Sequence, residues 1–250
     1  GTFIGDLNLS LADTRYLDSI SFKYGLTSYE LDLLGQNGFV VSERLKKISF
    51  GQSFLEIFHK DLPVFVSTDT ILHAFHISYD RILKDAELGC LIEKVKLLLQ
   101  GLHSGQNILF TKYGNNPKML TMLKDVDVYL TVPLKLFELN VSPYYPENAG
   151  IIDTILQLIY DEQMQPYPLF SETCKVLDWS QFKPRGHYDV DPGSISEADL
   201  PKYFRVMMWL GRTELYLLAP KQGMGWCDPQ TFADVQRQII DSYLIKELID

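Results

Sequence analysis

The stretch VSTDTILHAFHISYDRIL, residues 66–83, decides how the rest of the chain is interpreted. Its Ser-Thr-Asp cluster is typical of a helix N-terminus, so we predict a helix over residues 69–85. The large apolar side chains of this helix recur on one side; they are Ile71, Leu72, Phe75, Tyr79, Ile82 and Leu83. Such a face is normally the buried side of an amphipathic helix. We therefore expect this helix to be central to the hydrophobic core.

The same helix carries a polar stripe of Asp69, His73, His76 and Asp80, at spacings of four, three and four residues. These four side chains fall within an arc of roughly 60°. Imidazole and carboxylate together suit zinc, iron or manganese, so the four residues are candidate ligand-binding residues, with His73 and His76 as candidate metal ligands. The alternative is that Asp69 complements the helix dipole and that both histidines are ordinary half-buried side chains. The stripe is not an HExxH motif, which argues against a metalloprotease.

Helical signals dominate on both sides of this segment. Thr27 with Glu30, and Ser53 with Glu56, have the spacing of a capping box. Further helices are predicted over about 90–102, 117–139, 150–163 and 199–218, and after residue 229. Residues 103–116 are rich in Gly, Asn and Ser and are predicted to form a loop, Pro133 is expected to kink or divide its helix, and the proline-containing residues 164–198 are predicted to be irregular.

The predicted fold is all-α, that is, mostly helical with long irregular loops and minor or no β-structure. We expect the helices to pack in an orthogonal or array-like bundle. Hydrophobic residues make up 46% of the 250-residue chain, which is sufficient for a substantial core. We expect residues 1–250 to form a single helical domain. The last helix runs to the final residue without a stop signal, so this domain is expected to be part of a longer protein.

Charge and cysteine content exclude several classes of function. The net charge of −9 repels phosphate backbones, so nucleic acid is not an expected partner. No apolar run reaches the length of a membrane span. Cys90, Cys174 and Cys227 are far apart and form no CxxC pair, which excludes a zinc-finger site. Three cysteines allow at most one disulfide within the chain.

Two further groups of polar residues are candidate binding sites. Arg205, Trp209 and Arg212 share one stripe of a predicted helix, where the arginines could bind a carboxylate and the indole a sugar or a cation. The alternative is that both arginines pair with acidic residues of a neighbouring helix while Trp209 lies in the core.

The second group is the Pro184-Arg185-Gly186-His187-Tyr188 segment of the irregular stretch. The segment could perform acid–base chemistry or bind an anion, with Arg185, His187 and Tyr188 as the candidate residues. Gly186 between them tolerates a positive φ or a close backbone approach. Equally, the segment could be a structural clamp that holds a long loop onto the helices. We expect this loop to pack near the helix bearing His73 and Asp80, or near the helix bearing Arg205 and Arg212.

Four segments together resemble a known family: NGFVV (37–41), PVFVSTDTILHAFH (63–76), FKPRGHY (182–188) and KYFRVMMWLGR (202–212). The chain from about residue 25 onward resembles the secreted bacterial and archaeal proteins grouped as domain of unknown function 3160. The resemblance implies a helical fold and an extracytoplasmic location, whether secreted, periplasmic or surface-anchored. Family members are longer, so one expected partner is the rest of the protein's own chain. The family has no agreed activity, so the resemblance implies no reaction.

Two functions follow as hypotheses. The first is a binding or scaffold module with a polar cleft for a glycan, a peptide or another extracellular polymer, or for a small-molecule ligand. The second is a hydrolase, including a metal-dependent one, that uses His73 and His76 with the Arg185-His187-Tyr188 cluster. The sequence identifies no cofactor and no complete catalytic set.

Overall fold

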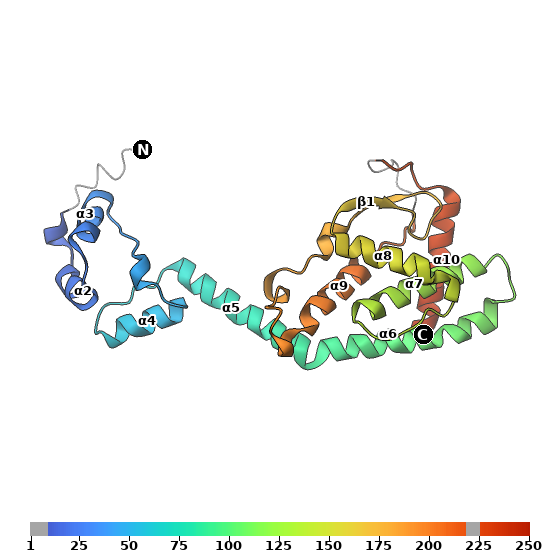
Figure 1. Ribbon diagram of the computed structural model, residues 1–250, viewed down its shortest axis with the longest axis horizontal. Helices are drawn as coiled ribbons and strands as arrows, with labels where there is room; N and C mark the ends of the chain where they lie inside the picture. Colours follow the sequence, from blue (N-terminus) through green and yellow to red (C-terminus); the bar gives the residue numbers. More distant parts are fainter. Residues whose placement is uncertain (1–9, 219–225) are drawn as a thin grey trace. The chain divides into compact units, whose positions relative to one another are not determined.

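The computed structural model describes residues 10–218 and 226–250 (Figure 1). The chain divides into two units, Gly1–Tyr79 and Asp80–Asp250. Among the described residues the secondary structure is mostly helical, with one sheet of two strands. This confirms the predicted fold class of a mostly helical protein with minor β-structure. No helix in the described part of the chain is both long and apolar enough to cross a membrane.

The first unit consists of short helices. They are η1 (Leu11–Asp13), α2 (Leu17–Tyr24), α3 (Ser28–Asn37), η2 (Glu43–Leu45) and α4 (Phe50–His59), followed by the first part of α5 (Thr68–Ala86). The predicted capping box of Thr27 and Glu30 is present at the start of α3. Glu30 also forms an ion pair with Arg44 at 2.7 Å, which ties α3 to η2. The second predicted capping box is wrong, because Ser49, not Ser53, caps α4.

Helix α5 does not have the core position predicted for it. None of its residues is buried, and Phe75 is 70% exposed. Ile71, Leu72 and Ile82 are also exposed in the structure. An amphipathic pattern shows which side of a helix is apolar, but not whether another element covers that side. The segment was therefore correctly predicted as a helix and wrongly predicted as the centre of the core.

The second unit is built around α7 (Leu120–Leu136), which contacts four other helices. These are α6 (Ile92–Tyr113), α8 (Ala149–Asp161), α9 (Asp199–Arg212) and α10 (Phe232–Ile249), and Figure 1 shows them grouped around it. The short η4 (Pro146–Asn148) precedes α8. Side chains of α7 such as Leu130 and Leu134 are fully buried. Pro133 lies in the last turn of α7 and leaves it a single helix.

Helix α6 is longer than the sequence pattern predicts. A five-residue π-helix, η3 (Glu87–Leu91), joins it directly to α5, and α6 then continues to Tyr113. The predicted loop over residues 103–116 is therefore wrong for most of its length. Gly101 and Gly105 weaken helix propensity locally, but Leu99 and Leu109 are buried against the rest of the unit. This tertiary packing outweighs the local preference.

The stretch predicted as irregular contains a β-hairpin. Strands β1 (Met164–Tyr167) and β2 (Lys175–Asp178) are antiparallel, with Met164 opposite Asp178 and Tyr167 opposite Lys175. Three single-turn helices follow: η5 (Trp179–Phe182), η6 (Gly186–Tyr188) and η7 (Ile195–Glu197). Prolines 166 and 168 obscure the alternation of β1 in the sequence, because proline is uncommon within strands.

Candidate functional site

The polar stripe on α5 is exposed over most of its length. Asp69, His73 and His76 are exposed, and the His73 ring packs edge-on against Phe50 with 5.1 Å between centroids. Residues 10–218 and 226–250 contain no group of three or more His, Cys, Asp or Glu side chains placed to hold a metal ion. Asp80, the fourth residue of the stripe, belongs to the second unit and has different neighbours.

Those neighbours are residues of the predicted loop. His187 Nδ1 lies 2.8 Å from Asp80 Oδ1, and His187 Nε2 lies 2.7 Å from Glu87 Oε2. The Tyr188 hydroxyl donates to Glu87 Oε1 at 2.6 Å. The predicted contact between this loop and the helix bearing Asp80 is thus confirmed. Sequence analysis missed Glu87, the first residue of η3, because it lies outside the stripe's spacing.

This cluster favours a charged histidine. Burial alone would lower the pKa of His187, but its hydrogen bonds to Glu87 and Asp80 outweigh burial and raise the pKa above its usual value. Burial and the bond to Glu87 likewise raise the pKa of Tyr188. The His187 and Glu87 side chains are only 8% and 9% exposed. Both imidazole nitrogens are occupied by carboxylates, so His187 has neither a free base nor a free metal-ligating nitrogen, and the cluster is best described as a clamp.

The loop also contacts α9, the second of the two predicted partners. The Tyr188 ring packs on Phe204, with 5.0 Å between centroids, and the Arg185 guanidinium lies 5.3 Å from the centre of the same ring. Gly186 has a φ of 62°, a conformation that glycine adopts without a side-chain penalty. The loop therefore links the C-terminal end of α5 to α9.

The stripe of Arg205, Trp209 and Arg212 is divided between different environments. Trp209 is fully buried, and its indole N–H donates to the Tyr129 carbonyl at 2.9 Å. The Arg205 guanidinium lies over the Tyr160 ring. Neither arginine forms an ion pair within the described residues, so the alternative of carboxylate partners is not observed. Arg212 is exposed and lies at the rim of a cleft.

This cleft, which we call the hairpin cleft, encloses about 820 Å³ of space that includes open solvent. It is bordered by β2, η5 and the end of α9. Its polar lining residues are Lys175, Asp178, Arg212, Thr213 and Glu214, and its apolar and aromatic ones are Leu169, Val176, Leu177, Trp179, Phe182 and Tyr216. Of these residues, only Arg212 belongs to the candidate groups predicted from the sequence; Trp179 could be considered a cleft aromatic but is more simply interpreted as a hydrophobic anchor, and the others come together only through the hairpin fold.

Lys175 is the most unusual of the lining residues. It is 6% exposed, and its ammonium donates to the Glu214 carbonyl at 3.0 Å and to Gln238 Oε1 at 2.6 Å. The ammonium also lies 4.5 Å from the centre of the Tyr216 ring. Burial disfavours the charged amine and lowers the pKa of Lys175 to about 8, although nearby carboxylates oppose the change.

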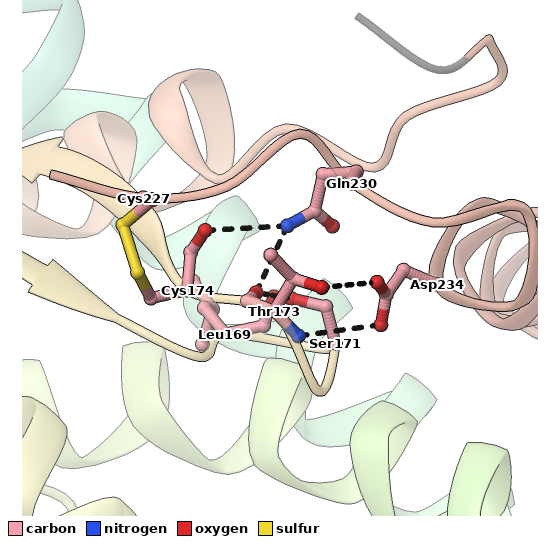
Figure 2. Close-up of a disulfide and its surroundings, with 7 residues drawn as sticks. All are labelled: Leu169, Ser171, Thr173, Cys174, Cys227, Gln230 and Asp234. Carbon is pink, nitrogen blue, oxygen red and sulfur yellow. Dashed lines mark hydrogen bonds between the residues drawn. A yellow bond between two sulfur atoms is a disulfide. The ribbon is translucent and has the colours of Figure 1, made fainter. Parts of the chain in front are cut away.

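The start of β2, where Lys175 lines the cleft, is fixed by a disulfide and its polar surroundings (Figure 2). Cys174, the residue before Lys175, is bonded to Cys227. Figure 2 shows the Gln230 amide donating to the carbonyls of Thr173 and Cys174, at 2.9 and 3.3 Å. Asp234 accepts a hydrogen bond from the Thr173 hydroxyl at 2.7 Å. The start of β2 is therefore tied to the segment that leads into α10.

A second polar cluster lies between α7 and α10. Arg237 donates two hydrogen bonds to Asp125, at 2.6 and 2.8 Å. Asp241 is 1% exposed, and neither of its carboxyl oxygens has a hydrogen-bond partner within the described residues. Burial, reinforced by the charge of Asp125, raises the pKa of Asp241 and favours its neutral form. The adjoining void has a volume of about 130 Å³, too small for a substrate, so this cluster serves the structure.

Comparison with known proteins gives one match. The family model described as "Protein of unknown function (DUF3160)" matches residues 27–250, which is most of the chain and includes the hairpin cleft and the His187 clamp. Neither the curated proteins nor the solved structures that were compared contain a significant match. The chain therefore belongs to the DUF3160 family of proteins of unknown function.

Proposed function

We propose that this chain is an extracytoplasmic binding module whose hairpin cleft holds a segment of a polar extracellular polymer. One observation carries the proposal: the cleft places an exposed arginine with spare donors among aromatic and charged side chains. Arg212 makes a single long hydrogen bond, of 3.4 Å to Gln181, within the residues that the structure describes. Its guanidinium carries five N–H donors, so most of them are open to a ligand.

The composition of the cleft supports binding. Ligand sites commonly combine apolar and aromatic walls with a few fixed polar groups. Here Leu177, Phe182 and Tyr216 supply the walls, while Lys175 is held in place by two acceptors. The lining residues include no histidine and no cysteine, the side chains most often used for proton transfer and nucleophilic attack. This composition supports ligand recognition, although Lys175, Asp178 and Glu214 are also side chain types that enzymes use for proton transfer.

The disulfide supports the proposed location. Cys174 and Cys227 are bonded in the structure, and disulfides persist mainly in oxidising compartments outside the cytosol. Cys174 immediately precedes Lys175, which lines the cleft. An oxidising environment, which keeps this disulfide formed, would therefore also favour the folded geometry of the cleft.

The hydrolase hypothesis has no comparable support. It required His73 and His76 to act with the Arg185-His187-Tyr188 cluster, but His73 and His76 are exposed. Both nitrogens of His187 are engaged by carboxylates. These contacts favour the clamp, so the binding module is the proposal that we carry forward.

Isothermal titration with soluble polysaccharides tests the proposal. The panel contains dextran, polygalacturonate and chitin oligosaccharides. We expect at least one to bind, and we expect Tyr216→Ala to weaken binding at least fivefold, because it removes one wall of the cleft. Tyr243→Ala is the matched control, since Tyr243 is an exposed tyrosine of α10 outside the cleft. Equal affinity in the wild type and Tyr216→Ala, or no binding across the panel, would reject the proposal.

A further inference from the structure

The Arg212 guanidinium at the hairpin cleft keeps unused hydrogen-bond donors. The Arg212 guanidinium carries five N–H donors. Within the described residues it makes one hydrogen bond, a long one of 3.4 Å to Gln181 Oε1, and no ion pair. The indole N–H of Trp179 also has no partner within the described residues, but it is sealed from solvent and is therefore out of reach of a ligand. A ligand that binds Arg212 must offer acceptors.

The acceptors of the cleft are mostly occupied. Asp178 Oδ1 accepts from the backbone N–H and the hydroxyl of Ser180, at 3.2 and 2.5 Å, and Asp178 Oδ2 accepts from Gln181 at 2.9 Å. These bonds, helped by the charge of Arg212, hold the pKa of Asp178 below its usual value. The backbone carbonyl of Glu214 is taken by Lys175. The exposed carboxylate of Glu214 is the lining acceptor that keeps free capacity.

The charge of the cleft also differs from that of the chain. Two cations, Lys175 and Arg212, face two carboxylates, Asp178 and Glu214, which gives a formal balance of zero. The chain as a whole carries −9. The cleft lining is thus less negative than the chain as a whole, which lessens the repulsion that an anionic group meets there. An arginine with spare parallel donors is well suited to a carboxylate, which it can hold with two hydrogen bonds.

From this arrangement we infer that the hairpin cleft selects a polysaccharide that contains uronic acid units, with the carboxylate of one unit bound by Arg212. The apolar face of the sugar ring packs on the aromatic wall formed by Tyr216 and Phe182. This inference rests on the proposed binding function and narrows it to one ligand class. A neutral sugar ring could pack on the same aromatic wall, but it would offer Arg212 no carboxylate to bind.

A pair of polymers that differ in charge alone tests the inference. Polygalacturonate and its methyl-esterified form are titrated by calorimetry against the whole chain at low ionic strength. We expect the acid form to bind at least tenfold more tightly, and we expect added salt to reduce this difference. Arg212→Gln should bring the two affinities together. Arg81→Gln is the control, because Arg81 is an exposed arginine of α5 that pairs locally with Asp85.

Each alternative outcome is distinct. If polygalacturonate and its methyl ester bind equally well, and Tyr216→Ala weakens the binding of both, the uronate inference is overturned and the proposed function is kept. Binding of polyglutamate in place of polygalacturonate would overturn the carbohydrate assignment. Failure of every polymer to bind would reject the proposed function itself. A second readout is the ¹⁵N-labelled indole signal of Trp179, which should shift with the acid polymer; an unshifted signal in a bound complex would place the ligand elsewhere.

Discussion

Lys175 and Gln238 are joined by a 2.6 Å hydrogen bond that connects the first residue of β2 to the middle of α10. The same Gln238 oxygen accepts from the backbone N–H of Tyr216 at 3.0 Å, and the Gln238 amide donates to Gln230 Oε1 at 3.1 Å. Gln238 is fully buried. One side chain thus holds together the hairpin, α10 and the segment that follows α9, which are the three parts that shape the hairpin cleft.

Gln238→Leu should destabilise the protein by about 2–3 kcal/mol, because it removes one of the two acceptors of the buried Lys175 ammonium and the acceptor of the Tyr216 N–H. Chemical denaturation followed by circular dichroism measures the free energy of unfolding. Gln157→Leu is the control, since Gln157 is an exposed residue of α8 whose partner is the local Asp161. A similar loss in both variants would show that the network around Lys175 contributes little.

His187 should make stability depend on pH. Its folded-state pKa is raised, so the stabilisation is complete below the unfolded pKa of about 6.5 and is lost as pH rises through the folded value. Denaturant melts across this range should show a decline in the wild type that is absent in His187→Gln. His76→Gln, a change at an exposed histidine of α5, should keep the wild-type profile. Parallel profiles for wild type and His187→Gln would contradict the clamp.

Asp241 should also make the stability of the protein depend on pH, over a different pH range from that of His187. Its raised folded-state pKa means that stability is greatest below the unfolded pKa of about 4 and falls as pH rises through the folded value. Asp241→Asn, a neutral side chain of the same shape, should therefore raise the free energy of unfolding at pH 7 by about 1–3 kcal/mol. Asp153→Asn on the exposed side of α8 should change it by less than about 0.5 kcal/mol. A destabilised Asp241→Asn would show that the carboxylate is charged and paired.

Two apolar substitutions should separate the exposed helix from the true core. Phe75→Ala on α5 should cost less than about 1 kcal/mol, because the side chain is 70% exposed. Leu134→Ala on α7 should cost about 2–5 kcal/mol, because that leucine is fully buried and its loss leaves a cavity. Unfolding monitored by tryptophan fluorescence compares the two. A cost for Phe75→Ala as large as that for Leu134→Ala would show that the face of α5 is covered in solution.

Removing the disulfide should weaken both stability and binding. The bonded cysteines are 53 residues apart, and a cross-link that closes a loop of this size typically contributes about 2–4 kcal/mol. The Cys174→Ser, Cys227→Ser double variant should therefore melt at a lower temperature in scanning calorimetry. It should also bind polymer less tightly, because Cys174 precedes Lys175. Dithiothreitol should lower the melting temperature of the wild type and leave that of the variant unchanged.

The features predictable from sequence were those with a local cause. Capping at Thr27 and helical periodicity gave the mostly helical fold class, and the number of cysteines limited the chain to one disulfide. Charge complementarity predicted that the His187 loop contacts the helix bearing Asp80 or the helix bearing Arg205; the loop contacts both, and its contact with α9 is aromatic packing on Phe204. The hairpin cleft could not be predicted, because Lys175 becomes unusual only when Gln238, 63 residues later, and the segment after α9 enclose it. Likewise, nothing in the pattern of α5 indicates that its apolar side stays exposed.

The π-helix at Glu87–Leu91 makes the joined helices α5 and α6 sensitive to length. A π-turn holds one more residue than an α-turn, and each residue of an α-helix advances the side chains by about 100°. Deleting a single residue here, such as Gly89, would restore regular α-geometry and turn Asp80 and Glu87 together, relative to α6, away from the direction in which they meet His187. Asp80 and Glu87 contact the same imidazole, at Nδ1 and Nε2 of His187 respectively. An added or lost residue between Asp80 and Glu87 would turn one of the two carboxylates away from the imidazole. We therefore expect homologues to tolerate substitutions of the residues between them far better than insertions or deletions there.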